Sequence, residues 1–221
     1  MLEIQTMEAL GNEFGVVDTV SQSVNPDEEP NIIKKCLEQF NFDQLLLIEP
    51  PTDKSADLKL KIYNVDGSLA ENCINGVRAV ALYAFDENLV SENHLLLQLE
   101  KSLAKITKTD DALFSVEMKD FSFAKASCDI ADTSKLEFNF EGKTISFEPV
   151  AVGNPHAVVF QEIDSKKIPE IGAALQESDI YQKGVNVGFV SVVVSNAINL
   201  RVVERGVGET LACGSGSCAA A

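Results

Sequence analysis

The sequence predicts an α/β (α+β) protein of two pseudo-symmetric lobes, each a curled, mostly antiparallel sheet around a central helix. Short apolar runs separated by turn residues dominate the chain, while few segments have helical spacing. A series of polar residues in the first half also recurs about 140 positions later. We therefore expect an N-terminal lobe at residues 1–118 and a C-terminal lobe at residues 119–221, each carrying one of two matched cysteines.

Strands account for most of the first half. The apolar runs predict strands at residues 14–18, 44–49, 58–63, 95–99, 104–107 and 114–118. Apolar and polar residues alternate in the segment 58–63, so one face of that strand should be exposed. The final three segments follow one another at short intervals and predict a meander.

Helices are fewer. Residues 31–40 have helical spacing directly after Pro30, a residue favoured in the first turn of a helix. Residues 76–85 are almost entirely apolar apart from Arg78, which predicts a helix buried at the centre of a lobe. A further short helix is expected at residues 173–178.

The polar residues of the first half have counterparts in the second half. The matched pairs are Asn12 with Asn154, Gln44 with Asn186, Asn64 with Glu204 and Cys73 with Cys213. The order is the same in both halves: two amides, then an amide or an acid, then a thiol. Four matches in register indicate an internal duplication.

The two cysteines carry the chemistry of this pattern. Cys73 and Cys213 each follow a glycine-containing turn and precede a segment with helical character. A thiol at a helix N-terminus is expected to have a lowered pKa, because the N–H groups favour the thiolate. A lone cysteine is most often a buried structural thiol, but the duplicated setting favours two proton carriers that face one site. Cys36, Cys128 and Cys218 are expected to be structural or incidental. His94 is expected on a surface loop.

Composition narrows the class of function. The net charge of −16 argues against nucleic acid or an anionic membrane as a partner, since binding either requires basic surface. The sequence shows neither a secretory signal nor an apolar run long enough for a membrane helix. Five cysteines without a CxxC pair, and two separated histidines, support neither disulfides nor a metal site. We expect a cytoplasmic protein.

Six segments together resemble the diaminopimelate epimerase family, over nearly the whole chain. The segments are Gly11-Asn12-Glu13-Phe14, Phe42-Asp43-Gln44-Leu45-Leu46, Tyr63-Asn64-Val65-Asp66-Gly67-Ser68, Cys73-Ile74-Asn75-Gly76-Val77-Arg78, Gly153-Asn154-Pro155-His156 and the long block at residues 204–219. The resemblance implies a cofactor-independent isomerase that interconverts LL- and meso-2,6-diaminopimelate, in lysine and peptidoglycan precursor synthesis. It implies no cofactor, no metal, a small-molecule substrate and a homodimer.

The resemblance also implies residue roles. Cys73 and Cys213 match the two catalytic thiols, one removing the α-proton while the other delivers a new one. The matched substrate-binding positions are Asn12, Gln44, Asn64, Ile74, Asn75, Asn154, Asn186, Glu204, Arg205, Gly214 and Ser215. His156 and Glu204 match positions that tune the pKa of the thiols. Arg205 is suited to hold a carboxylate with two hydrogen bonds.

The chain departs from the family pattern in several places. Ile74 stands where the family has glycine after the first cysteine, and a β-branched residue resists a positive φ and could crowd the substrate. Asn41 replaces the usual glycine before Phe42, and residues 100–103 replace an Ala-Asn-Gly turn. The family continues well past the second cysteine block, so we expect the chain to be a C-terminally incomplete form.

Three alternatives stay open at this point. A related racemase that acts on another amino acid without pyridoxal phosphate is the nearest, because Ile74 would alter the pocket. A truncated, non-catalytic homologue would keep the fold as a binding module. A thiol redox protein would instead work through a reversible disulfide between Cys73 and Cys213.

Overall fold

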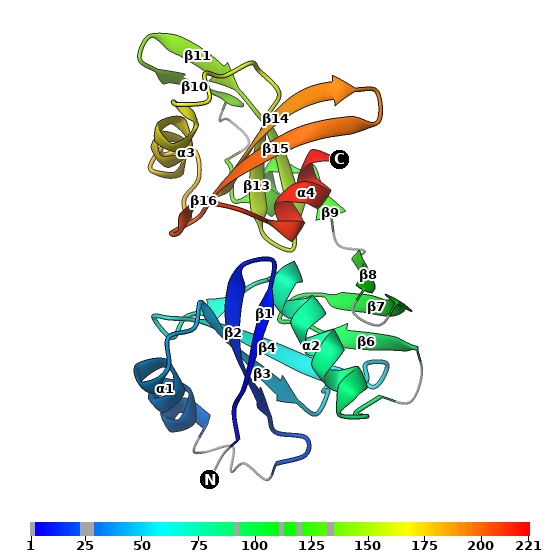
Figure 1. The fold of residues 1–221 in the computed structure, drawn as a ribbon. Helices are drawn as coiled ribbons and strands as arrows, with labels where there is room; N and C mark the ends of the chain where they lie inside the picture. The colour runs from blue at the N-terminus through cyan, green and yellow to red at the C-terminus, as the bar shows by residue number, and fades with distance from the viewer. Residues whose placement is uncertain (1–2, 23–28, 91–92, 111–112, 119–120, 132–134) are drawn as a thin grey trace. The chain divides into compact units, whose positions relative to one another are not determined.

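The computed structural model describes residues 3–22, 29–90, 93–110, 113–118, 121–131 and 135–221. It divides into two compact units, residues 1–119 and 120–221, which are coloured from blue to green and from green to red in Figure 1. The division expected between residues 118 and 119 falls beside residues 119 and 120, which are outside the described residues.

The first unit is a sheet with two helices. Its elements are β1 (Gln5–Ala9), β2 (Asn12–Asp18), α1 (Glu29–Gln39), β3 (Gln44–Glu49), β4 (Leu58–Asn64), β5 (Leu69–Ala70), α2 (Ile74–Asp86), β6 (His94–Gln98), β7 (Leu103–Asp110) and β8 (Leu113–Met118). Among the described residues the strands form one eight-stranded sheet in the order β1-β2-β3-β4-β6-β7-β8, with β5 paired to β4. The pairs β2–β3 and β4–β6 are parallel and the others antiparallel. The predicted mostly antiparallel sheet and its β6–β8 meander are confirmed.

The central strand β3 is buried on both faces, which explains its continuous apolar run. Leu46 and Ile48 belong to the core on the face covered by α2. Leu45 and Leu47 belong to a second core, together with residues of α1. Figure 1 shows α1 and α2 on opposite sides of this sheet. The predicted apolar helix is therefore confirmed as a buried element that fixes the position of the residues at its start.

The second unit repeats this arrangement and adds a hairpin. Its elements are β9 (Phe121–Ser122), the 3₁₀ helix η2 (Lys125–Cys128), β10 (Glu137–Phe140), β11 (Lys143–Ser146), β12 (Glu148–Val152), β13 (Pro155–Val159), α3 (Ile168–Gln176), β14 (Asn186–Val194), β15 (Ala197–Glu204), β16 (Gly208–Thr210) and α4 (Gly214–Ala220). The main sheet of the described residues has the order β16-β15-β14-β13-β12-β9, and β10 pairs with β11. Val150 and Val158 pack towards α4, whereas Val159 and Val187 share a core with α3.

Strand register repeats between the units. Phe14 lies opposite Gln44 in the parallel pair β2–β3, and His156 lies opposite Asn186 in the parallel pair β13–β14. The antiparallel pairs β4–β5 and β15–β16 repeat in the same way. The observed register supports the predicted duplication because equivalent residues occupy equivalent places in two sheets.

Two sequence expectations need correction. The third helix begins at Ile168 rather than Ala173, because Pro169 is accommodated in its first turn, where no intrahelical hydrogen bond is lost. His94, expected on a surface loop, is the first residue of β6 and is only partly exposed. In the described part of the chain, no helix is long and apolar enough to cross a membrane.

Candidate active site

Both candidate thiols cap a helix. Cys73 is the N-cap of α2, with extended backbone angles (φ −150°, ψ 100°), and its Sγ accepts a hydrogen bond from the Gly76 N–H at 3.4 Å. Cys213 is the N-cap of α4 (φ −132°, ψ 106°), and its Sγ accepts from the Gly216 N–H, also at 3.4 Å. The predicted position of each cysteine at the start of a helix is therefore confirmed. All five cysteines are in the thiol form.

Each thiol is paired with a glycine that closely approaches the sheet. A Cβ on Gly76 would lie 3.0 Å from Cδ2 of Leu46. A Cβ on Gly216 would lie 3.1 Å from Cγ2 of Val202 and 3.2 Å from Sγ of Cys213. Both helices thus begin where only a glycine fits without displacement of a neighbour, and its N–H reaches the thiol.

In the first unit, a chain of amides leads away from Cys73. Asn75, in the first turn of α2, donates from Nδ2 to Oδ1 of Asn12 at 2.9 Å. Asn12 in turn donates to Oδ2 of Asp43 at 3.4 Å, and the Glu13 N–H donates to the same oxygen at 2.8 Å. The structure therefore brings Asn12 and Asn75 together at the start of α2, which Cys73 caps, with Asp43 fixing the outer amide.

The other two predicted amides of this unit form a second cluster. Gln44 donates from Nε2 to Oδ1 of Asn64 at 2.9 Å, across the antiparallel pair β3–β4. Asn64 donates to Oγ of Ser68 at 3.1 Å, and the Ser68 hydroxyl donates to Asp66 at 2.6 Å. Gln44 and Asn64 are only partly buried, so their amides can still meet a ligand.

In the second unit, His156 replaces the apolar Phe14 at the equivalent register position. It is 1% exposed, and its Nε2 lies 3.0 Å from Oδ1 of Asn154. Since that oxygen can only accept, Nε2 carries the hydrogen and Nδ1 is left as an acceptor. Burial and the nearby charge of Arg205 lower the pKa of His156 to about 4. The imidazole is therefore neutral at pH 7.

Asn186 ties two segments of this unit together. Its Oδ1 accepts from the Arg205 N–H at 2.9 Å, and its Nδ2 donates to the carbonyl of Pro155 at 3.5 Å. The Arg205 guanidinium donates from Nη1 to the carbonyl of Lys183 at 3.2 Å. Asn186 is 5% exposed, so its amide holds the backbone of Arg205 rather than reaching outward.

Cys213 has an acid and a hydroxyl as neighbours. Burial, then the charge of Glu204, raise the pKa of the Cys213 thiol to about 11, against hydrogen bonds from Ser215 and the Gly216 N–H. The Ser215 hydroxyl lies 3.6 Å from Sγ. The expected lowering of the thiol pKa is therefore wrong for Cys213, because burial and a nearby carboxylate outweigh the donors at the helix start. This thiol is protonated at neutral pH.

Ile74 is the first residue of α2, next to Cys73. It has helical backbone angles and is absent from the residues with positive φ, so a β-branched side chain is compatible with the backbone there. The predicted conflict with positive φ does not arise. The Ile74 side chain, at the start of the helix, is partly exposed.

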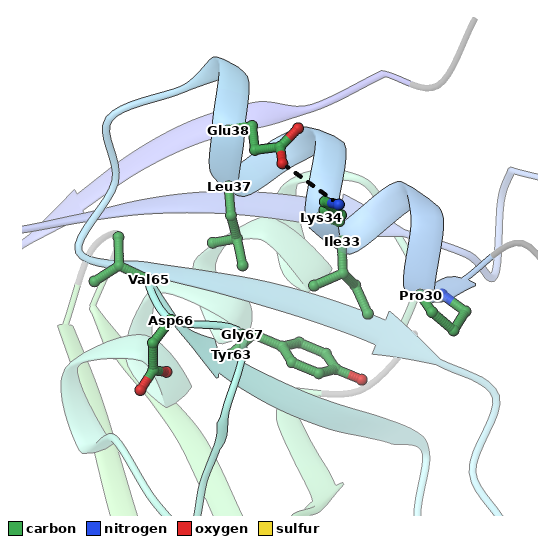
Figure 2. A pocket seen from close by; sticks show the side chains of 9 residues that line it. All are labelled: Pro30, Ile33, Lys34, Leu37, Glu38, Tyr63, Val65, Asp66 and Gly67. Atoms are coloured by element: carbon green, nitrogen blue, oxygen red, sulfur yellow. Dashed lines mark ion pairs between the residues drawn. The ribbon is translucent and has the colours of Figure 1, made fainter.

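A cavity of about 520 Å³ lies on the α1 face of the first unit, and Cys73 is not among its lining residues. Its lining residues are Pro30, Ile33, Lys34, Leu37, Glu38, Tyr63, Val65, Asp66 and Gly67. Figure 2 shows the Lys34–Glu38 ion pair on one side of it and Tyr63 on the other. None of the predicted site residues lines it, although Asn64 belongs to the same turn as Val65.

The described residues do not gather three or more His, Cys, Asp or Glu side chains in a way that could hold a metal ion. What the two clusters offer is acid–base chemistry: a thiol, backbone N–H groups at a helix start, and amide donors around it. Three residues in contact with the predicted ones were missed, namely Asp43, Ser68 and Thr210. Each lies inside a motif segment quoted above, next to or near a predicted residue, which is the signal that could have identified it.

The chain matches one protein family along most of its length. The family model described as diaminopimelate epimerase matches residues 5–123 and 149–221. The chain is 35% identical to a protein named diaminopimelate epimerase from Laribacter hongkongensis, over 99% of the chain and 81% of that protein. It is 36% identical to a protein of the same name from Alkalilimnicola ehrlichii, over 97% of the chain and 79% of that protein. A crystal structure of a hydroxyproline epimerase from Agrobacterium vitis has a similar fold, with a TM-score of 0.70 and 15% identity over 99% of this chain and 75% of that one.

Proposed function

Since the chain belongs to the diaminopimelate epimerase family, we propose that it interconverts LL- and meso-2,6-diaminopimelate by proton transfer between two cysteines. The observation that supports this proposal most is the duplicated N-cap thiol. Cys73 and Cys213 stand at equivalent positions of two helices, each in contact with a glycine N–H. Two equivalent proton carriers suit a reaction that removes a proton from one face of a carbon and returns one to the other face.

The chemistry needs more than two thiols. The α-proton of an amino acid is weakly acidic, so negative charge that develops on the substrate carboxylate must be stabilised. The first N–H groups of a helix have no intrahelical acceptor and carry the positive end of the helix dipole. We assign this role to the N–H groups of Ile74, Asn75, Gly214 and Ser215, at the starts of α2 and α4.

The raised pKa of Cys213 assigns its resting role. A thiol with a pKa of about 11 is a proton donor at neutral pH. In the direction in which Cys213 donates, its S–H bond breaks and a C–H bond forms at the α-carbon. In the other direction Cys213 must first lose its proton, and the adjacent Glu204 carboxylate is the acceptor we assign. His156 is neutral, with Nδ1 as a hydrogen-bond acceptor, and we assign it a part in setting the pKa of the thiols.

The remaining polar residues are assigned to the substrate. Asn12, Gln44, Asn64, Asn75, Asn154, Asn186, Glu204 and Arg205 offer amides, an acid and a cation, which suit a substrate with an amino-acid group at each end. Asn186 acts through Arg205, since its amide accepts from the Arg205 backbone. We further propose that the protein acts in the cytoplasm, in lysine and peptidoglycan precursor synthesis, and that it forms a homodimer. Its mass in solution tests the homodimer.

The activity is tested by incubating the protein with LL-diaminopimelate and separating the stereoisomers by chiral chromatography. We expect meso-diaminopimelate to form without added pyridoxal phosphate or metal. The double variant Cys73→Ala/Cys213→Ala should form none. A panel of other amino acids in the same assay examines whether Ile74 redirects the enzyme. Inversion of another amino acid in place of diaminopimelate would contradict the proposed substrate.

A further inference from the structure

A hydroxyl near Cys213 has no part in the proposed chemistry so far. Thr210 is the last residue of β16, three residues before Cys213, and its Oγ1 donates a hydrogen bond to Oε1 of Glu204. Glu204 ends the neighbouring strand β15, and the two strands pair with Val202 opposite Thr210. Because side chains two apart on a strand share a face, Thr210, Val202 and Glu204 lie on the same side of the sheet.

The carboxylate that Thr210 holds is the one that acts on the thiol. Both the charge of Glu204 and a hydrogen bond with it raise the pKa of Cys213. Glu204 is only partly buried, and a free glutamate side chain would turn towards water. The hydrogen bond from Thr210 holds one oxygen of this carboxylate, Oε1, and so restrains the side chain that acts on the thiol.

The first unit supports the importance of this anchor, because it holds the equivalent residue by another hydroxyl. Asn64 takes the place of Glu204, and Ala70 takes the place of Thr210, opposite Ile62. Asn64 is instead anchored by Ser68, at 3.1 Å, from the turn before β5. Two different positions therefore provide a hydroxyl for the same polar site.

Other charges around β15 and β16 are engaged elsewhere. Arg201 donates to both carboxylate oxygens of Glu209, at 2.5 and 2.8 Å. On α3, which packs against both strands, Glu170 is paired with Lys167 at 2.9 Å. The charge of Arg205 acts on His156, which is itself neutral. The carboxylate next to Cys213 is thus the charge that Thr210 can control.

We propose that Thr210 is a positioning residue, whose hydroxyl holds the Glu204 carboxylate where it exchanges a proton with Cys213. In that step the S–H bond of Cys213 breaks and an O–H bond forms on Glu204, and the reverse restores both groups. The placement of the carboxylate stands on contacts within the second unit. Its catalytic consequence rests on the proposed function.

The test compares Thr210→Val, which keeps the shape and removes the hydroxyl, with Thr210→Ser, which keeps the hydroxyl. Iodoacetamide reacts with the thiolate, so its rate at pH 8, measured for each cysteine by peptide mass spectrometry, reports the ionised fraction. In Thr210→Val we expect the carboxylate to turn away, which lowers the Cys213 pKa and raises its alkylation rate about 3- to 10-fold. Thr210→Ser should stay near wild type.

Matched controls separate positioning from unfolding. The buried Cys36 and Cys128 should keep their rates in every variant, since they become reactive only when the fold opens. In a Glu204→Gln background, Thr210→Val should change the Cys213 rate no further, because Thr210 acts only through that carboxylate. In the epimerase assay, Thr210→Val should lower kcat about tenfold with little change in KM.

The outcomes are distinguishable. An unchanged Cys213 rate in Thr210→Val, or an equal increase in the Glu204→Gln background, would overturn the proposal. A rise at Cys36 and Cys128 in parallel with Cys213 would also overturn it, since Thr210 would then be a stability residue. If the alkylation pattern is as expected but the wild type shows no epimerisation, the positioning role stands and the proposed function fails.

Discussion

The two halves of the chain present the same thiol at the same place on a helix and surround it differently. At the start of α2, the amide of Asn75 donates to the amide of Asn12. Beside Cys213, the polar neighbours are an acid, Glu204, and a hydroxyl, Ser215. The two halves thus share the helix, its capping thiol and the glycine that contacts it, while the polar neighbours differ. In the reaction proposed above, the protons of the two thiols would be controlled by different groups.

The largest effects on activity are expected at the two thiols themselves. Cys73→Ala and Cys213→Ala should each lower the rate of epimerisation by about 10³-fold or more, because each removes an acid–base group that the other cannot replace. Cys218→Ser, at the exposed cysteine of α4, is the matched control and should leave the rate unchanged. Epimerisation at near wild-type rate by either alanine variant would show that one thiol suffices.

The cores of the two halves also differ, which a pair of alanine substitutions can measure. Leu58 is the first residue of β4, lies opposite Leu97 of β6 and is 3% exposed. Its counterpart Ile198 on β15 is 40% exposed, in a hairpin that also exposes Val192 and Val194. We expect Leu58→Ala to lower the free energy of unfolding by about 3 kcal/mol and Ile198→Ala by less than about 1 kcal/mol, by urea denaturation. Equal losses would show that the hairpin is covered in solution.

His156 and Phe14 occupy equivalent positions, so His156→Phe makes the second half resemble the first. The pKa of His156 is about 4 in the folded protein and near 6.5 unfolded. Between these values the unfolded chain binds a proton that the folded one does not, so stability present above pH 6.5 is lost as the pH falls towards 4. This contribution is about 3 kcal/mol. Between pH 7 and pH 4, the free energy of unfolding of His156→Phe should therefore fall by about 3 kcal/mol less than that of the wild type. Denaturation curves at the two pH values measure this difference. An equal fall in both proteins would show that folding does not lower the pKa of His156.

The smallest expected effect concerns Gly76 and Gly216, whose N–H groups contact the capping thiols. Gly76→Ala and Gly216→Ala should each lower the free energy of unfolding by about 1 kcal/mol, because the strain of a tight contact exceeds the gain in helix propensity. Only Gly216→Ala places its Cβ within 3.2 Å of a thiol, so it alone should change the alkylation rate of Cys213. A net stabilisation by either substitution would show that the close approach is not needed.

The sequence predicts the regular part of this fold well. The apolar run 44–49 and the alternating run 58–63 coincide with β3 and β4 nearly to the residue. A strand buried on both faces has a continuous apolar sequence, and a strand buried on one face has an alternating one. The start of α3 was not predictable, because Pro169 and a weak apolar period hide its first turn. For the candidate site, the family motifs and the repeated order of polar residues located the two thiols that cap helices.

The properties set by three-dimensional neighbours were not predictable. The helix-start rule predicts a lowered pKa for Cys213, yet burial and Glu204 raise it, and both arise from strands brought together by folding. Asp43 and Thr210 likewise acquire their roles only through contacts with a residue of a neighbouring strand, Asn12 of β2 and Glu204 of β15. A residue type at a motif position shows what chemistry is available, while burial and charge decide its protonation state.

The direct test of the two-thiol reaction is the position of deuterium after brief reaction in heavy water. The enzyme is incubated with LL-diaminopimelate in D₂O, stopped at low conversion, and the substrate and product stereoisomers are separated and analysed by mass spectrometry. A thiol carries one proton, so the base that removes the substrate hydrogen returns only that hydrogen, while the opposite thiol delivers deuterium. We expect deuterium at the α-carbon of the meso product and essentially none in the recovered LL substrate. Equal deuterium in both isomers at low conversion would contradict two separate proton carriers.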